Sequence, residues 1–143
     1  MGYSSCENLE VWKRACDLAV TICRESVGVR QFALRNQIQR SAISIPSNIA
    51  EGSARDSAAD FIRFLRIAKG STAELRTQLL IAKRLDQWEQ DAFILADREA
   101  REINAMIQGL IRFLTTNSAS LKDASPADET SLTDPKTISN TQY

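Results

Sequence analysis

The sequence predicts an all-α protein in which four helices form an antiparallel up-down-up-down bundle. Four segments carry apolar residues at the alternating spacings of three and four that define one face of a helix. The connections between these segments are short, so consecutive helices should pack side by side in opposite directions. The 143 residues include only three prolines and five glycines, and this length is typical of one domain with an ordinary core.

The first helix is expected from about Ser5 to Glu25, because the apolar residues recur there with helical spacing and Val27-Gly28-Val29 interrupts the pattern. It contains Cys6, Cys16 and Cys23. Cys16 and Cys23 should lie about 10 Å apart along the axis, whereas a disulfide requires Cα atoms within about 7 Å. Without histidine or a C-x-x-C motif no zinc site is expected, and the thiols are interpreted as buried in a reducing cytoplasm.

The second helix, expected from about Arg30 to Ala54, is apolar on two faces. The stripe expected to face the bundle consists of Leu34, Ile38, Ala42, Ile45 and Ile49. A second stripe of small or apolar residues consists of Ile43, Pro46, Ala50 and Ala54. Both apolar faces of such a helix must be covered, one by the helix's own bundle and the other by another subunit. A proline inside a helix costs about 3 kcal/mol, which favours a bend around an oligomer axis, with Ser44 or Asn48 satisfying the freed backbone.

A line of polar residues separates the two apolar stripes and has two interpretations. It comprises Gln37, Arg40, Ser44, Asn48, Glu51 and Arg55. The line is either a solvated face, with Glu51 and Arg55 as an i,i+4 ion pair, or a partly buried network at a subunit interface or ligand groove. The second helix by itself does not separate these alternatives.

The third helix is expected to begin after Ser57, a good N-cap with Asp60 three residues later, and to end near Asp86. Glycine costs up to about 1 kcal/mol inside a helix, so Gly70-Ser71 indicates a close crossing with another helix. The fourth helix is expected over residues 91–116. Residues 1–116 should therefore form the bundle. Residues 117–143, which are polar and hold two of the three prolines, should form a flexible tail.

The neutral total charge hides a basic half of the molecule. The second helix has four arginines against one glutamate, and the third has six basic residues against three acidic ones, a net of +3 in each. In a symmetric oligomer these helices would form a basic ring that attracts phosphate, whereas the alternative is that the asymmetry only tunes solubility or pairs the helices. No aromatic residues are interleaved for sequence-specific readout. The candidate phosphate contacts are Arg40, Arg55, Arg63, Arg66, Lys69 and Arg76.

No catalytic constellation is found. Glu51 and Glu74 are a candidate carboxylate pair across the second and third helices. Without histidine, an activated nucleophile or a metal motif, they are interpreted as a core polar pair, and no catalytic residue, cofactor or metal is expected. No apolar run approaches the roughly 18 residues of a membrane span, and the N-terminus lacks the features of a secretory signal. A cytoplasmic location without membrane contact is therefore expected.

Three motifs resemble one bacterial family of four-helix bundles. They are Leu9-x-x-Trp12-x-x-Ala15, Gln37-Ile38-x-Arg40-x-Ala42-x-Ser44-Ile45-Pro46-x-Asn48-Ile49-Ala50-Glu51-Gly52 and Phe64-Leu65-x-Ile67-Ala68-x-Gly70-Ser71-x-x-Glu74-Leu75. The family includes proteins encoded within intervening sequences of 23S ribosomal RNA genes and the related accessory variability determinant of diversity-generating retroelements. The resemblance spans about residues 8–114.

The resemblance implies a closed bundle that assembles into a homopentameric barrel. For the retroelement branch it also implies binding to nucleic acid and to a reverse transcriptase, a larger nucleic-acid-processing protein. That branch is strongly basic, whereas this chain is neutral. The leading hypothesis is a non-enzymatic assembly scaffold that contacts RNA or DNA through its second and third helices. The alternative is a protein-interaction module with no nucleic-acid role, whose polar seam is Gln37, Ser44, Asn48, Glu51, Gly70, Ser71 and Glu74.

Overall fold

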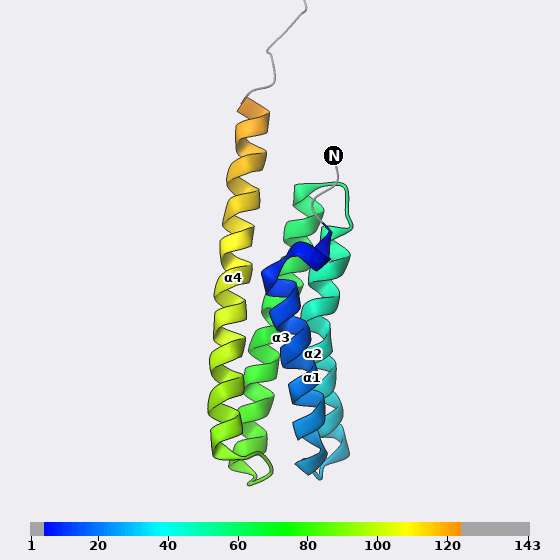
Figure 1. Cartoon of the computed structure of the whole chain (residues 1–143), viewed down its shortest axis with the longest axis vertical. Coiled ribbons are helices and arrows are strands. Elements are labelled where there is room, and N and C mark those ends of the chain that lie inside the picture. The colour runs from blue at the N-terminus through cyan, green and yellow to red at the C-terminus, as the bar shows by residue number, and fades with distance from the viewer. Residues whose placement is uncertain (1–4, 124–143) are drawn as a thin grey trace, which may run out of the picture.

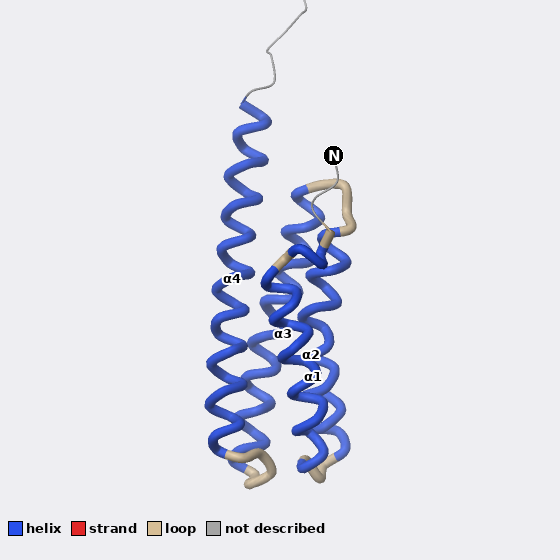
Figure 2. The backbone as a smooth tube through the Cα atoms, in the orientation of Figure 1, coloured by secondary structure: helices blue, strands red, loops and turns tan. Residues whose placement is uncertain are grey.

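The computed structural model describes residues 5–123, and in this part of the chain every regular element is a helix. A short 3-10 turn, η1 (Cys6–Asn8), precedes α1 (Glu10–Glu25), and a second turn, η2 (Ser26–Gly28), follows it. The remaining helices are α2 (Phe32–Ser53), α3 (Ala58–Arg84) and α4 (Gln90–Asp123). Figure 2 shows that the connections between them are short. Within residues 5–123, no helix is sufficiently long and apolar to cross a membrane.

The four long helices lie alongside one another. The α1–α2 and α3–α4 connections are at one end of the molecule and the α2–α3 connection is at the other (Figure 1). The α2 backbone packs against α1 and α3, and the α4 backbone packs against the same two helices. In the described part of the chain, the backbones of α1 and α3 do not approach each other, nor do those of α2 and α4. The edge formed by α2 and α3 is therefore opposite the edge formed by α1 and α4.

The core lies between the helices and is built mainly from isoleucine and leucine. The predicted inner stripe of α2 is confirmed, since Ile38, Ala42, Ile45 and Ile49 are buried and Leu34 is half-buried. Other fully buried large side chains are Ile22, Leu65, Leu75, Leu79, Ile103 and Ile107. Burying a side chain of this size stabilises a fold by about 1.5–3 kcal/mol, so these contacts supply the main favourable term.

Local chemistry defines both ends of α3, which lie close to the predicted boundaries. The Ser57 hydroxyl accepts a hydrogen bond from the backbone N–H of Asp60 at 3.1 Å, which is the expected N-cap. At the other end, Asp86 adopts a left-handed backbone with φ of 56°. The N–H groups of Asp86 and Gln87 then bond to the carbonyls of Lys83 and Ala82, both at 2.9 Å. This is the Schellman arrangement that ends a helix.

Two predicted boundaries differ from the structure. The first α-helix begins at Glu10, because residues 6–8 form the separate turn η1 and Leu9 has an extended backbone. The fourth helix continues to Asp123, beyond the predicted end at Thr116. Serine, threonine and asparagine disfavour a helix only weakly, so a helix that is already formed continues through them until a stronger stop. The rest of the predicted tail, residues 124–143, lies outside the described residues.

Candidate interaction surface on α2 and α3

A groove with a volume of about 610 Å³ runs between α2 and α3 on their solvent side. It is lined by Gln37, Arg40, Ser41, Ser44, Ile67, Gly70, Ser71, Glu74 and Gln78. Five residues of the predicted polar seam therefore line one surface feature, although they come from two separate segments of the chain. We call this feature the α2/α3 groove.

Polar side chains form two separate hydrogen-bonded groups between α2 and α3 at the α2/α3 groove. The Asn48 side-chain amide donates to the carbonyl and the hydroxyl of Ser44, at 2.8 and 2.9 Å. The Ser44 and Ser71 hydroxyls lie 2.8 Å apart, and the Ser71 hydroxyl donates to the backbone carbonyl of Ile67 at 3.2 Å. The Ser41 hydroxyl donates to Oε1 of Gln78 at 2.7 Å. Of the polar line on α2, Ser44 and Asn48 are half-buried in this network, whereas Gln37, Arg40, Glu51 and Arg55 are exposed and Glu51 forms the expected i,i+4 pair with Arg55.

Gly70 leaves an open notch in the wall of this groove. A Cβ atom built at Gly70 would meet no heavy atom within 4 Å. The close helix crossing predicted at Gly70 is therefore not made among residues 5–123. The crossing within the chain occurs instead at Gly52, where a Cβ would come within 2.8 Å of side-chain atoms of both Phe61 and Phe64.

The predicted carboxylate pair is not formed. Because Ser44 faces Ser71, Glu74 is level with Ser41, about ten helical residues or 15 Å below Glu51 along the axis. Glu51 instead binds Arg55 at 2.9 Å, and both side chains are exposed. The interpretation of Glu51 and Glu74 as a core polar pair is wrong, because both carboxylates lie on the surface at separate levels of the bundle.

The second apolar stripe of α2 is covered only in part by the chain itself. Pro46 is buried, so its own bundle already covers it. Ala50 is half-buried, whereas Ile43 is 49% exposed and Ala54 is also exposed. The side chain of Asn48 bonds to Ser44, as described above, and the α-helix is continuous through the proline.

Two of the candidate phosphate contacts flank the ring of Phe64. The guanidinium carbon of Arg55 lies 4.9 Å from the ring centre, and that of Arg63 lies 4.5 Å from it. Arg55 also binds Glu51, and Arg63 lies 3.8 Å from the carboxylate of Asp60. These cations therefore already have partners within the bundle.

The other candidate phosphate contacts divide into two groups. Lys69 donates to Gln108 at 2.7 Å and Arg76 binds Asp97 at 2.7 Å, so both side chains reach toward α4 and away from the α2/α3 groove. Among the described residues, Arg40 and Arg66 are exposed and have no ion-pair partner. The structure does not bring the six cations together on one surface.

Sequence reasoning missed a charged groove on the opposite edge of the molecule. It has a volume of about 320 Å³ and is lined by Arg14, Asp17, Leu18, Thr21, Glu25, Ala92, Leu95, Ala96 and Glu99. We call it the α1/α4 groove. The Arg14 guanidinium donates two hydrogen bonds to the Glu99 carboxylate, each 2.8 Å long, and also binds Glu102. No sequence signal identifies this pairing, because Arg14 and Glu99 are 85 residues apart in the chain.

The Arg14–Glu99 contact shifts the titration of the carboxylate. Hydrogen bonds from Arg14 lower the pKa of Glu99 below its ordinary value, with a smaller opposing contribution from burial.

On the other side of α1, burial raises the pKa of the Cys16 thiol, and the nearby Asp17 adds to that effect. All three cysteines are free and half-buried, whereas the sequence predicted buried thiols, because each lies at the border of the apolar face of its segment.

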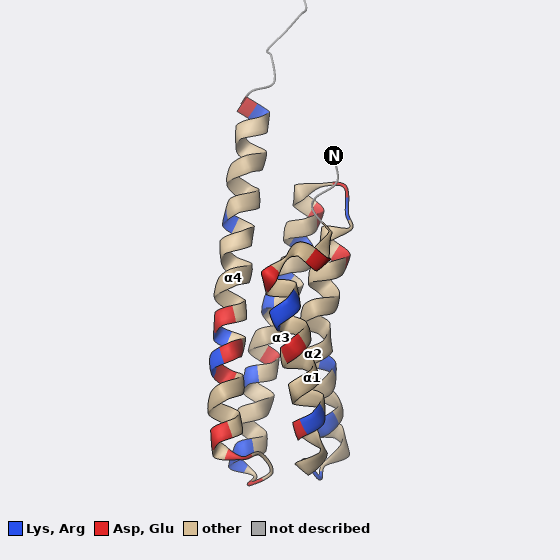
Figure 3. Cartoon of the chain, in the orientation of Figure 1, with Lys and Arg blue, Asp and Glu red and all other residues tan. Residues whose placement is uncertain are grey.

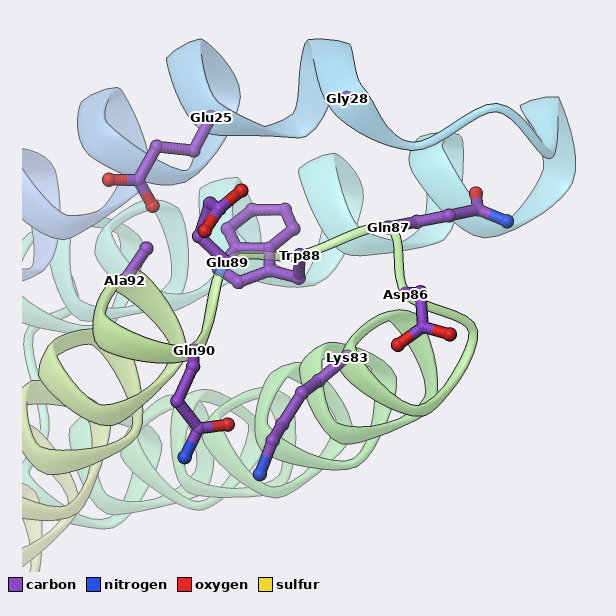
Figure 4. Close-up of a pocket in the computed structure, with 9 residues that line it drawn as sticks. All are labelled: Glu25, Gly28, Lys83, Asp86, Gln87, Trp88, Glu89, Gln90 and Ala92. Carbon is purple, nitrogen blue, oxygen red and sulfur yellow. The ribbon is translucent and has the colours of Figure 1, made fainter.

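A third cavity, of about 650 Å³, lies at the α3–α4 loop (Figure 4). Glu25, Lys83, Asp86, Gln87 and Glu89 line it beside the buried ring of Trp88. The indole N–H of Trp88 is buried without a hydrogen-bond partner in the described part of the chain, and it does not reach the open space. Within residues 5–123, no three His, Cys, Asp or Glu side chains are grouped so that they could hold a metal ion.

Comparison with known proteins gives the family and the fold. The family described as 23S rRNA-intervening sequence protein matches residues 7–109. A solved structure from Bacteroides thetaiotaomicron, described as a protein with unknown function from the S23 ribosomal protein family, is similar. It is 28% identical, has a TM-score of 0.68, and the match covers 71% of this chain and 97% of that one. No curated protein matches the sequence significantly.

Proposed function

The chain belongs to the 23S rRNA-intervening sequence protein family, and on this premise we propose that it is a non-enzymatic homo-oligomeric scaffold. In this proposal the helices form an antiparallel up-down-up-down bundle, and bundles assemble into a barrel-shaped homopentamer. The α2/α3 groove is the seam between subunits. The pairing of Ser44 with Ser71 and of Ser41 with Gln78 supports the antiparallel order, because the residue number falls along α3 as it rises along α2.

The open notch at Gly70 is the observation on which the seam depends. Glycine in a helix interior costs up to about 1 kcal/mol relative to alanine, and no atom of residues 5–123 requires its small size here. The exposed Ile43 and the 44% exposed Ile67 add apolar surface beside the groove. The groove floor is neutral and its hydroxyl groups are already hydrogen-bonded, so burying it would leave few unpaired polar groups.

Filling the notch tests the seam directly. Gly70→Leu should convert the oligomer to a monomer, because the added side chain occupies the space that a neighbouring subunit needs. The matched control is Gly109→Leu, since Gly109 also has no atom near its Cβ position but lies on α4. Light scattering coupled to gel filtration gives the subunit number, and circular dichroism checks that both variants stay helical. An intact oligomer with Gly70→Leu would contradict the seam.

Nucleic-acid binding through α2 and α3 is the second candidate function. It is favoured by Arg40 and Arg66, which are exposed and have no ion-pair partner among the described residues. Oligomer symmetry would repeat these charges around a ring. Any bound RNA or DNA in this role is held by its phosphates, since the described part of α2 and α3 offers no exposed row of aromatic rings for stacking.

The salt dependence of the affinity tests whether RNA or DNA is held through its phosphates. Fluorescence anisotropy with a labelled single-stranded RNA and a DNA duplex should show affinity that falls steeply with added salt. Arg40→Glu with Arg66→Glu should abolish the binding, whereas Arg112→Glu with Lys122→Glu, which changes the total charge equally, should have a smaller effect. Absent or salt-insensitive binding would eliminate the nucleic-acid role and leave the scaffold.

A further inference from the structure

We infer that the acidic segment after α4, residues 124–143, binds back along a strip of cations at the boundary between α3 and α4 of the same copy. The strip consists of Lys69 and Arg76 on α3 and Arg101 and Arg112 on α4, and we call it the α3/α4 strip. Because the strip and the segment belong to one chain, the inference goes beyond the proposed scaffold and does not depend on it.

The cations of the α3/α4 strip form two parallel rows. Lys69 and Arg76 are about two helical turns apart, so they lie on one line along α3. Both side chains reach α4, where Lys69 meets Gln108 and Arg76 meets Asp97. Arg101 also binds Asp97, at 2.9 Å, which places it beside the α3 row. The printed contacts therefore bring cations of both helices to one face of the bundle.

The bundle compensates only part of this charge. Asp97 is the single carboxylate for the guanidiniums of Arg76 and Arg101, whose side chains are 37% and 64% exposed. The Lys69 ammonium bonds to the neutral amide of Gln108 and keeps its full charge. Arg112 is exposed and has no ion-pair partner among residues 5–123. Four cations against one carboxylate leave the strip with a net charge of +3.

The other acidic residues of α3 and α4 lie away from the strip. Between Glu102 and Asp123 α4 has no acidic residue, and Figure 3 shows this stretch of the helix without acidic positions. Glu102 pairs with a guanidinium of α1, Asp60 pairs with Arg63, and Glu74 lines the α2/α3 groove. Three more carboxylates are at the α3–α4 loop and the start of α4, below the strip: Asp86, Glu89 and Asp91.

The segment after α4 supplies the complementary charge. It contains three carboxylates, Asp128, Glu129 and Asp134, against the single cation Lys136. Its two prolines oppose a continued helix, so its reach is that of an extended chain. Opposite charge on a covalently attached segment makes that segment a natural occupant of the strip.

The spacing of the carboxylates fits the spacing of the cations. Arg112 and Arg101 are about 16 Å apart along α4, at 1.5 Å per residue. Glu129 and Asp134 are also about 16 Å apart in an extended chain, at about 3.3 Å per residue. One carboxylate can therefore meet each guanidinium at the same time.

The segment is also long enough to reach the strip. Arg112 lies about 16 Å back along α4 from its last residue, Asp123. Residues 124–128 supply about 16 Å of extended chain, and the long arginine side chain adds to this reach, so the chain has room to turn back.

Tethering makes such a contact effective although exposed ion pairs are individually weak. A tethered segment is present at its site at a concentration on the order of millimolar, so a modest affinity keeps it bound. The bound segment neutralises the α3/α4 strip and excludes other polyanions from it. Added salt should release the segment, because the Debye length falls to about 3 Å at 1 M ionic strength.

Zero-length carbodiimide crosslinking tests the contact directly, because it joins a carboxylate to an amine that it touches. Mass spectrometry should find Lys69 joined to Asp128 or Glu129 at low salt, and this product should disappear at about 1 M NaCl. Lys13, which is exposed on α1, is the control and should not be joined to the segment. Labelled and unlabelled copies, unfolded and refolded together, show whether a crosslink is within one copy. Absence of the Lys69 product, or a product found only between copies, would overturn the inference.

Binding of heparin, a polyanion, tests whether the segment occupies the strip. Deleting residues 124–143 should tighten heparin binding about 10-fold or more, since it exposes the strip. The full-length variant Asp128→Asn, Glu129→Gln, Asp134→Asn should behave like the deletion, and circular dichroism checks that the bundle is intact.

The matched control for total charge removes three exposed carboxylates from the α1 side, as Glu7→Gln, Glu10→Gln and Glu25→Gln. An equal gain in heparin affinity in this control would overturn the inference, because total charge would then explain the effect. A monomeric wild-type chain would eliminate the scaffold but would leave both results for the segment unchanged.

Discussion

At the scale of single residues, Gly52 shows how closely α2 and α3 approach. A Cβ at this position would lie 2.8 Å from Cδ2 of Phe61 and from Cβ of Phe64, and 3.2 Å from the carbonyl oxygen of Phe61. The Phe64 Cβ is attached directly to the α3 backbone, so it cannot move aside unless the helix shifts. The absence of a side chain at Gly52 is therefore a condition for the helix packing that forms the α2/α3 groove.

Gly52→Ala should lower the free energy of unfolding by about 1–3 kcal/mol, since overpacking a tight contact exceeds the gain in helix propensity. Urea denaturation followed by circular dichroism measures this change. Gly109→Ala is the control and should raise stability by up to about 1 kcal/mol, because its Cβ meets open space. Equal effects in the two variants would contradict the close contact at Gly52.

Glu99 should make stability depend on pH at the acidic end. Hydrogen bonds from Arg14 lower the pKa of Glu99 in the folded chain, so the unfolded chain holds more protons at this site as the medium becomes acidic. The stabilisation is therefore complete above the unfolded pKa of about 4.3 and is lost as the pH falls through the lower folded pKa.

The Glu99→Gln variant should lose less stability between neutral and acidic pH than the wild type, as measured by urea midpoints across that range. Arg14→Met removes the donor and should flatten the curve in the same way. Should Glu99→Gln keep the wild-type acid dependence, the Arg14–Glu99 contact would not be its source.

At the scale of elements, α4 is longer than the bundle that it belongs to. It continues beyond the level of the α2–α3 turn (Figure 1). Leu114 is still buried, whereas Leu121 is 75% exposed. Residues 119–123 are all exposed. The terminal turns of α4 therefore depend on helix propagation and receive little support from the rest of the described chain.

Ser120→Pro should shorten α4 without changing the thermal midpoint of the bundle, since little of the folded core would be lost. The ellipticity at 222 nm should fall slightly, by a few residues of helix. The same change at Ala105, which is exposed but lies inside the bundled part of α4, should cost about 3 kcal/mol or more. A large drop in midpoint with Ser120→Pro would show that the end of α4 is packed against a partner.

At the scale of the whole molecule, association should be linked to folding. Anything that binds the folded chain and not the unfolded chain raises apparent stability by mass action, and a second copy is such a ligand. The thermal midpoint of the wild type should therefore rise with protein concentration. Gly70→Leu should abolish this dependence, whereas Gly109→Leu should retain it. A concentration-independent midpoint for the wild type, measured by calorimetry over a hundredfold range, would argue against a homo-oligomer.

The sequence by itself determined where the helices lie and which of their residues form the core. Apolar spacing, the Ser57 cap and the break near Gly28 act over a few residues, so their effect is legible from the chain alone. Five of the seven residues assigned to the polar seam, namely Gln37, Ser44, Gly70, Ser71 and Glu74, line one groove, whereas Asn48 and Glu51 do not line it. The end of α4 could not be predicted from the sequence, because weak helix formers neither start nor stop a helix reliably.

Only the tertiary structure decided which side chains meet. It separated Glu51 from Glu74 by the length of several helical turns, turned Lys69 and Arg76 toward α4, and paired Arg14 with Glu99. It also moved the close helix crossing from Gly70 to Gly52 and left Gly70 open. Such outcomes depend on the rotation and axial offset of one helix against another. The summed packing of the whole core sets these two quantities, and no short stretch of sequence encodes them.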